Sequence, residues 1–154
     1  MIKEINVFGR RFIFFSKKIH KTAGVNSNLK DGRHVLFFDF DNVDLETVKK
    51  ELYQVMFIYQ LPSVTILSTG RPNSFHAFCF KRKTLTEALH IVLDCPHIDK
   101  VFVMMAFKRG WFTLRISEKN GRTPTYLTTL HSNFQSDCTS NDLDKFTIYE
   151  TGKS

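Results

Sequence analysis

Two short segments of the chain combine residue types that bind cations and phosphates. In 35-VLFFDFDN-42, Asp39 and Asp41 stand two residues apart at the end of an apolar run. In 66-ILSTGRPNSFHAFCF-80, Ser74 and His76 have the same spacing just after a turn. Residues two apart on a strand point to the same side, so each pair should share one face. Adjacent carboxylates repel each other, and a bound divalent cation commonly neutralises this repulsion. A metal site beside a serine and a histidine that can bind phosphate indicates phosphoryl or nucleotidyl chemistry.

The elements that must position these residues follow from hydrophobic periodicity. Apolar runs predict strands over 34–40, 64–69 and 74–81, and helical spacing of apolar residues predicts a helix up to about residue 60. Either Asn42 or Asp44 can cap that helix. The sequence 70-GRPN-73 is typical of a turn between two strands.

The second half of the chain predicts another helix and more strands. The helix runs from Leu85 to Cys95, with Thr84 and Glu87 forming a capping box before it and Pro96 ending it. Residues 98–109 fit a strand or a helix, and the following Gly110 favours a short helix. Alternating patterns predict strands at the end of the chain, over 111–117, 125–131 and 146–150.

The N-terminal part of the chain carries most of the positive charge. Residues 1–33 hold eight basic and two acidic residues. The stretch 5–15 predicts strand material with a turn or bulge at Gly9, and 22–32 predicts a loop rich in glycine and asparagine. We interpret this part as an edge hairpin with a basic flap, which either contacts nucleic acid or protects a sheet edge from aggregation. The candidate nucleic-acid contacts are Arg10, Arg11, Lys17, Lys18, Lys81, Arg82 and Lys83.

Length and composition indicate one globular domain. The 154 residues are 42% hydrophobic and 24% charged, with a net charge of +7 that favours an anionic partner such as nucleic acid. The three cysteines form no CxxC pair, so we expect neither a structural zinc site nor a disulfide framework. No apolar run reaches the roughly 20 residues that span a bilayer, so an intracellular, cytoplasmic protein without membrane contact is expected. Within the domain, 1–33 is the hairpin and flap, 34–131 the core and 132–154 a C-terminal extension.

The order of the predicted core elements is strand, helix, strand, strand, helix and strand. This βαββαβ order is that of α+β proteins with a ferredoxin-like or RNA-recognition (RRM-like) fold. One sheet face then packs on the helices. The opposite face stays open and is expected to carry the two carboxylates, Ser74 and His76 together.

The two segments, taken with this frame, resemble the first two signature motifs of the archaeo-eukaryotic primases. That superfamily includes primase-polymerases of plasmids and viruses, and such a source is expected here. The motifs are Asp39-x-Asp41 at a strand end and 74-SFH-76 after a strand and a glycine-containing turn. The segment 111-WFTLRISEKNGR-122 is similar to a strand near the third motif of some members. The resemblance covers roughly residues 34–122.

The resemblance implies a DNA primase-polymerase that transfers nucleotides from NTPs or dNTPs to a 3′-hydroxyl on a DNA template or primer. Asp39 and Asp41 would bind two divalent metal ions, Mg²⁺ or Mn²⁺, and Ser74 and His76 would contact the triphosphate. Arg115 would be a further phosphate contact. The family's third acidic residue has no direct counterpart, so Glu118 is the first candidate and Asp99 the second. The family's zinc-binding module is missing, which implies an accessory domain or a partner such as a replicative helicase.

Other interpretations of these residues stay open. The carboxylates could cap the next helix, His76 could be a satisfied core histidine, and Arg115 could form a surface ion pair. The chain could also be a nucleic-acid or nucleotide-binding module of this fold without catalysis.

A second enzyme interpretation is that 35-VLFFDFDNV-43 and 66-ILSTGRP-72 resemble the first two motifs of haloacid-dehalogenase-type phosphatases. Asp39 would then be a nucleophile, and Ser68 or Thr69 would hold the phosphate. The later acidic pair that those enzymes require is missing, since 141-NDLDK-145 is a poor substitute.

Overall fold

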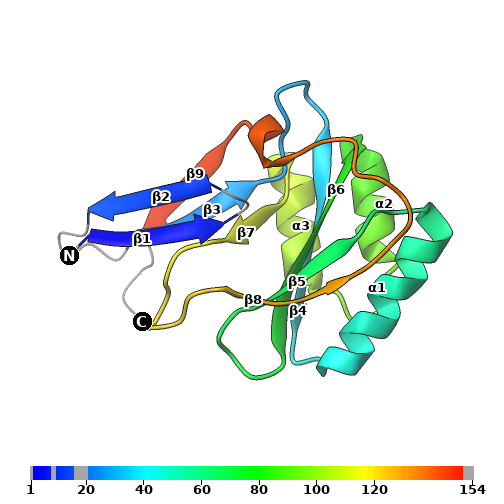
Figure 1. Ribbon diagram of the computed structural model, residues 1–154, viewed down its shortest axis with the longest axis horizontal. Helices are drawn as coiled ribbons and strands as arrows, with labels where there is room; N and C mark the ends of the chain where they lie inside the picture. The colour runs from blue at the N-terminus through cyan, green and yellow to red at the C-terminus, as the bar shows by residue number, and fades with distance from the viewer. Residues whose placement is uncertain (1, 8–9, 16–20, 151–154) are drawn as a thin grey trace.

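The computed structural model describes residues 2–7, 10–15 and 21–150 (Figure 1). Two of the predicted nucleic-acid contacts, Lys17 and Lys18, lie outside the described residues. Arg10 and Arg11 belong to a described strand, but their side chains also lie outside what is described. Those four predictions therefore stay predictions.

The described chain is an α+β structure with three α-helices and antiparallel sheets of three and four strands. The three-stranded sheet has the order β7-β3-β9 and the four-stranded sheet the order β4-β6-β5-β8, while β1 and β2 form a separate hairpin. The elements are β1 (Ile2–Val7), β2 (Arg10–Phe15), β3 (Lys21–Asn26), β4 (His34–Asp41), α1 (Leu45–Tyr59), β5 (Val64–Ser68), β6 (Ser74–Lys83), α2 (Leu85–Leu93), α3 (Lys100–Arg109), β7 (Thr113–Arg115), β8 (Thr125–Leu130), a 3₁₀ turn (Ser140–Asp142) and β9 (Phe146–Glu150).

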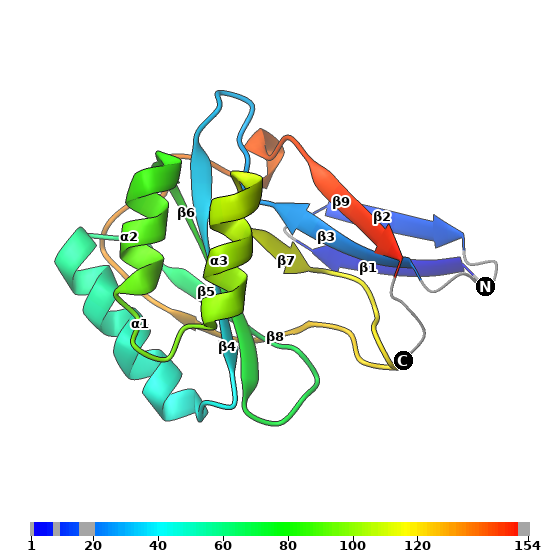
Figure 2. The ribbon, with the colours of Figure 1, turned by 180° about the vertical axis from the view of Figure 1, so that it is seen from behind.

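The four-stranded sheet is built around a split β-α-β unit. Strands β4 and β5 are joined through α1, and β6 lies between them, antiparallel to both. All three helices cover one face of this sheet, as Figure 2 shows from the helix side. Figure 1 looks onto the opposite face, which carries no helix.

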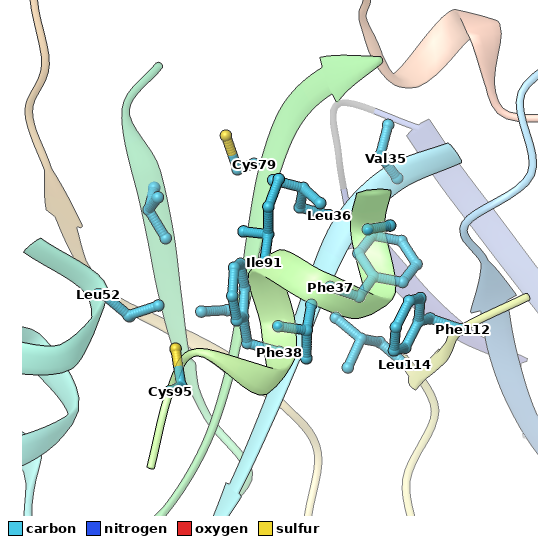
Figure 3. Packing of buried hydrophobic residues seen from close by; sticks show 14 of the residues in the cluster. Val35, Leu36, Phe37, Phe38, Leu52, Cys79, Ile91, Cys95, Phe112 and Leu114 are labelled. Atoms are coloured by element: carbon cyan, nitrogen blue, oxygen red, sulfur yellow. The ribbon is translucent and has the colours of Figure 1, made fainter. Parts of the chain in front are cut away.

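The core forms because β4 is apolar on both of its sides. Five consecutive side chains of β4, from His34 to Phe38, are buried, which is the pattern of a strand covered on both faces. Figure 3 shows part of this core, with Leu52 from α1, Ile91 from α2 and Phe112 and Leu114 from the β7 segment around the strand. Each fully buried phenylalanine contributes roughly 1.5–3 kcal/mol relative to an exposed one.

The helix boundaries agree with the predicted capping chemistry. Asp44, one of the two predicted caps, caps α1 by accepting a hydrogen bond from the backbone N–H of Thr47. Thr84 and Glu87 form the predicted capping box of α2. The ambiguous segment 98–109 is helical over Lys100–Arg109, with Asp99 as the N-cap of α3 and Gly110 at its C-terminus. The preference for a helix there is confirmed.

The predicted loop over 22–32 is wrong in its first half, where the chain forms β3. This strand lies between β7 and β9 and hydrogen-bonds to both. A Cβ atom at Gly24 would lie 2.5 Å from Cγ2 of Thr113, so the missing side chain lets β3 and β7 approach each other. The glycine therefore serves close strand packing and not a turn.

The predicted βαββαβ order along the chain is present, with α3 as an additional helix, but its last strand does not join the main sheet as the RRM-like fold requires. The strand expected over 111–117 is the short β7, which pairs with β3 in the other sheet. The fourth position of the main sheet is taken by β8, on the free side of β5. The alternating pattern of 111–117 identified a strand, but pairing between distant strands decides which sheet it joins. Among the described residues, no helix is both long and apolar enough to cross a membrane.

Candidate functional site

The two predicted residue pairs lie directly opposite each other on adjacent strands. In the antiparallel ladder of β4 and β6, Asp39 is opposite His76 and Asp41 is opposite Ser74. Directly opposed residues project from the same face of a sheet. The two carboxylates, the hydroxyl and the imidazole therefore share the face that carries no helix, as the spacing predicts.

One carboxylate oxygen of Asp41 is contacted by both a hydroxyl and a guanidinium. Ser74 Oγ donates a hydrogen bond of 2.7 Å to Asp41 Oδ1, and Arg71 Nη1 lies 3.7 Å from the same oxygen. Neither aspartate caps a helix, since Asp44 does so. Arg71 was not among the predicted site residues. The sequence feature that could have identified Arg71 is its place in the turn between β5 and β6.

The turn that carries Arg71 is fixed by hydrogen bonds and by close packing. Thr69 Oγ1 donates to the carbonyl of Ser74 at 3.2 Å and accepts from the backbone N–H of Arg71 at 3.4 Å. A Cβ atom at Gly70 would lie 2.9 Å from Cβ of Arg122, so the glycine lets this turn touch the loop after β7. This contact brings Arg71, in the turn, and Arg122, in the loop, to the same end of the sheet.

Asp39 is the more buried of the two aspartates and its acidity is strongly changed. Its side chain is 21% exposed. Burial raises the pKa of Asp39 to about 7, with further raising by the charges of Asp41 and Asp99, while Arg115 and Arg71 lower it. Ionising Asp39 is unfavourable because its carboxyl group is buried. A bound cation would stabilise the ionised carboxylate.

His76 is buried beside Asp39 and carries an unsatisfied nitrogen. Its Nε2 lies 3.6 Å from Asp39 Oδ1, and its Nδ1 is buried with no hydrogen-bond partner among the described residues. Burial, followed by the charge of Arg115, lowers the pKa of His76 to about 4. The imidazole is therefore neutral at physiological pH. It differs from a satisfied core histidine because one buried ring nitrogen has no hydrogen-bond partner among the described residues.

Arg115 reaches the site from the other sheet. Its guanidinium donates to the carbonyl of Thr69, at the end of β5, at 3.1 Å, and to the carbonyls of Ser117 and Arg122 at 2.7 and 2.8 Å. Its charge acts on both Asp39 and His76. The structure therefore brings Arg115 to the predicted group, as a positive charge held by three backbone carbonyls.

The remaining predicted acidic residues do not complete a cluster of metal ligands. Asp99 lies beside Asp39, whose carbonyl accepts from the Asp99 backbone N–H at 2.8 Å, but its carboxylate caps α3 through Val101 N–H. Glu118 lies in the loop after β7. No group of three His, Cys, Asp or Glu able to hold a metal occurs in the part of the chain that the structure describes.

The donor set nevertheless fits one hard cation of the expected kind. Mg²⁺ is commonly held by one or two carboxylates and completes its octahedron with water and substrate phosphates. Asp39 and Asp41 supply such a pair, with side chains 21% and 35% exposed, and a cation would offset the cost of ionising the buried Asp39. Mn²⁺ accepts the same oxygen ligands.

The three basic residues at the end of β6 lie away from this group. Lys81 Nζ is 3.1 Å from Asp137, and Arg82 contacts Asp31, Asp137 and Asp142. Lys83 lies opposite His34, at the other end of the β4–β6 ladder from Ser74. Lys81 and Arg82 therefore hold the segment around Asp137 and Asp142 against the sheet, a structural role that the sequence did not predict.

The geometry argues against the phosphatase interpretation. Its motifs require a parallel, doubly wound sheet, whereas every pairing in the described sheets is antiparallel. The segment after the turn is β6, where that fold needs a helix. Ser68 Oγ accepts from the backbone N–H of Gly70, and Thr69 is buried, so both serve the turn.

Comparisons of the chain with protein-family models, with curated proteins and with solved structures found no match in any of the three.

Proposed function

We propose that this chain is a metal-dependent nucleotidyltransferase of the primase-polymerase type, acting on a nucleic-acid template with NTPs or dNTPs. The single observation that carries the proposal is the register of β4 and β6, which sets Asp39 opposite His76 and Asp41 opposite Ser74. Two carboxylates beside a neutral imidazole and fixed arginines match the needs of a cation-bound polyphosphate. The split β-α-β unit carries these residues on a helix-free sheet face, which supports the proposal.

Each residue has a definite role in this proposal. Asp39 and Asp41 hold Mg²⁺ or Mn²⁺, which when bound would neutralise phosphate charge and favour ionisation of an attacking 3′-hydroxyl. His76 binds a phosphate oxygen through a ring nitrogen, and Ser74 fixes the orientation of Asp41. Arg71, 50% exposed at its side chain, is placed to contact a phosphate.

A second candidate function is nucleotide binding without transfer. It is favoured by the missing third carboxylate in the described residues and by the positive charge of Arg115 close to Asp39. A single cation with an arginine beside it holds a triphosphate well, but activates a 3′-hydroxyl less well than two cations do. Metal-dependent triphosphate binding is common to both candidates.

The deciding experiment measures incorporation of labelled nucleotides on a primed single-stranded template in Mg²⁺ and in Mn²⁺. The primase-polymerase proposal expects incorporation that is lost in the double variant Asp39→Asn, Asp41→Asn. Asp144→Asn, an exposed carboxylate outside the group, is the matched control and should leave it unchanged. Metal-dependent nucleotide binding without incorporation supports the second candidate, and the absence of both contradicts the two together.

A further inference from the structure

An exposed tyrosine lies in the same cross-strand row as the candidate metal and phosphate residues. Asp39 is opposite His76, His76 is opposite Leu67 on β5, and Leu67 is opposite Tyr126 on β8. Opposed residues in an antiparallel sheet project from one face. The β5–β8 register is irregular between Ile66 and Leu67, but the Tyr126 hydroxyl lies 3.2 Å from Oγ1 of Thr129, which is opposite Thr65 on the same face as Leu67. The row therefore runs across the helix-free face of the sheet from a carboxylate to an aromatic ring, with β8 at its far edge (Figure 1).

The exposure of the tyrosine ring is not explained by packing. Tyr126 is 67% exposed, whereas Leu67 beside it is partly buried and His76 is buried. Its hydroxyl lies 3.2 Å from Thr129 Oγ1 on the same strand, which restrains the tip of the ring. An aromatic side chain held at one end and exposed on its faces is suited to stacking.

The spacing along the row matches an extended nucleotide. Adjacent strands lie about 4.8 Å apart, so three steps from β4 to β8 separate Asp39 from Tyr126 by about 14 Å. This is the scale that separates the terminal phosphates of a nucleoside triphosphate from its base. The charge is arranged accordingly, with Arg71 and Arg115 beside the carboxylates and the apolar Leu67 between them and the ring.

We propose that Tyr126 is the base-binding platform of this site, on which the base of a bound nucleotide stacks while its phosphates lie at Asp39, Asp41 and His76. The proposal rests on the proposed function and adds the subsite for the base. Stacking of a base on an aromatic ring is tolerant of base identity. The platform therefore gives affinity for nucleotides as a class, with little discrimination among the four bases.

The test compares two probes in the presence of Mn²⁺ by calorimetry: ATP and inorganic tripolyphosphate. In the unmodified protein, ATP should bind more tightly than tripolyphosphate, because only ATP reaches the ring. Tyr126→Ala should weaken ATP binding roughly tenfold, within the range of base stacking, and leave tripolyphosphate binding unchanged. Tyr126→Trp should retain ATP binding, and Tyr53→Ala, an exposed tyrosine on α1, should change neither probe.

The outcomes separate this inference from the proposed function. ATP binding that Tyr126→Ala leaves intact, together with normal tripolyphosphate binding, overturns the platform and preserves the phosphate site. Tyrosine-dependent ATP binding without tripolyphosphate binding supports the platform and contradicts the phosphate site. Loss of binding of both probes in the unmodified protein overturns the two proposals. A thermal melt of each variant confirms folding, which an exposed ring should not affect.

Discussion

Asp39 and His76 are opposite each other on β4 and β6, with Asp39 Oδ1 3.6 Å from His76 Nε2, yet they do not form an ion pair. Burial raises the pKa of Asp39 to about 7 and lowers the pKa of His76 to about 4. The imidazole is therefore already neutral over the pH range in which the carboxyl group ionises. The neighbours thus leave the carboxylate uncompensated by histidine, a situation that a bound divalent cation would relieve.

The first prediction concerns Asp39→Asn. The pKa of Asp39 in the folded chain, about 7, is above its ordinary 3.8, so its contribution to stability is fully present below 3.8 and is lost as pH rises through 7. Asparagine removes this loss. The variant should therefore gain on the order of 1–3 kcal/mol in free energy of unfolding at pH 8 while losing Mn²⁺ binding. Urea unfolding at pH 5 and pH 8, with Mn²⁺ titration, checks both.

The pH dependence of this gain is the control for the first prediction. Asp39→Asn should change stability little at pH 3.5, where the unmodified carboxyl is protonated. A uniform gain at both ends of the range would show that packing, and not ionisation, is responsible. Destabilisation at pH 8 would contradict the raised pKa of Asp39.

The second prediction concerns the acid limb of stability through His76. Its folded pKa of about 4 lies below its ordinary 6.5, so its contribution to stability is present above 6.5 and is lost as pH falls towards 4. His76→Gln should flatten the loss of stability over this range, because glutamine does not titrate. Imidazole resonances followed by NMR should show His76 neutral at pH 5.5, and a protonated ring there would refute the assignment.

The third prediction concerns Arg115→Met, which keeps an unbranched apolar stem and removes the charged guanidinium. Three carbonyls lose their donor, so we expect a loss of roughly 1–3 kcal/mol in free energy of unfolding. The pKa of Asp39 should rise further, since the charge of Arg115 lowers it in the intact protein. At pH 9, where the carboxyl group is ionised, Mn²⁺ binding should tighten, because the variant removes the repulsion between the guanidinium and the divalent cation. A pH series of Mn²⁺ titrations checks this.

The stoichiometry of metal binding adds a check on the role of Arg115. In the presence of tripolyphosphate, nucleotidyl transfer expects two Mn²⁺ ions per chain, and binding without transfer expects one. A second ion that is lost in Glu118→Gln would show that Glu118 joins the group on binding. Arg109→Met, an exposed arginine at the end of α3, serves as the control for loss of charge alone.

The fourth prediction concerns the contact between β3 and β7. Gly24→Ala should destabilise the chain by roughly 1–3 kcal/mol, because the new Cβ would lie 2.5 Å from Cγ2 of Thr113. Thr113→Ser removes that methyl group and retains the hydroxyl that donates to Asn26. The double variant should therefore recover part of the loss in thermal unfolding. If the double variant recovers no stability, then the backbone of Leu114, and not the methyl group of Thr113, is what the new Cβ atom clashes with.

Local chemistry in the sequence determined much of the site. The spacing of two in Asp39-x-Asp41 and Ser74-x-His76 predicts shared faces, because side chains alternate along any strand. The caps at Asp44 and Thr84 and the turn at 70–73 also follow from residues close together in the chain. These features need no knowledge of distant segments, and the structure agrees with them.

Only the tertiary structure decided how these pieces meet. The register that sets Asp39 opposite His76 joins segments far apart in the chain, and the burial that moves their pKa values comes from surrounding layers. Arg115 arrives from the second sheet because β7 pairs with β3, a strand whose glycine suggested a loop. Strand pairing and desolvation depend on long-range packing, for which a local pattern of residue types carries little information.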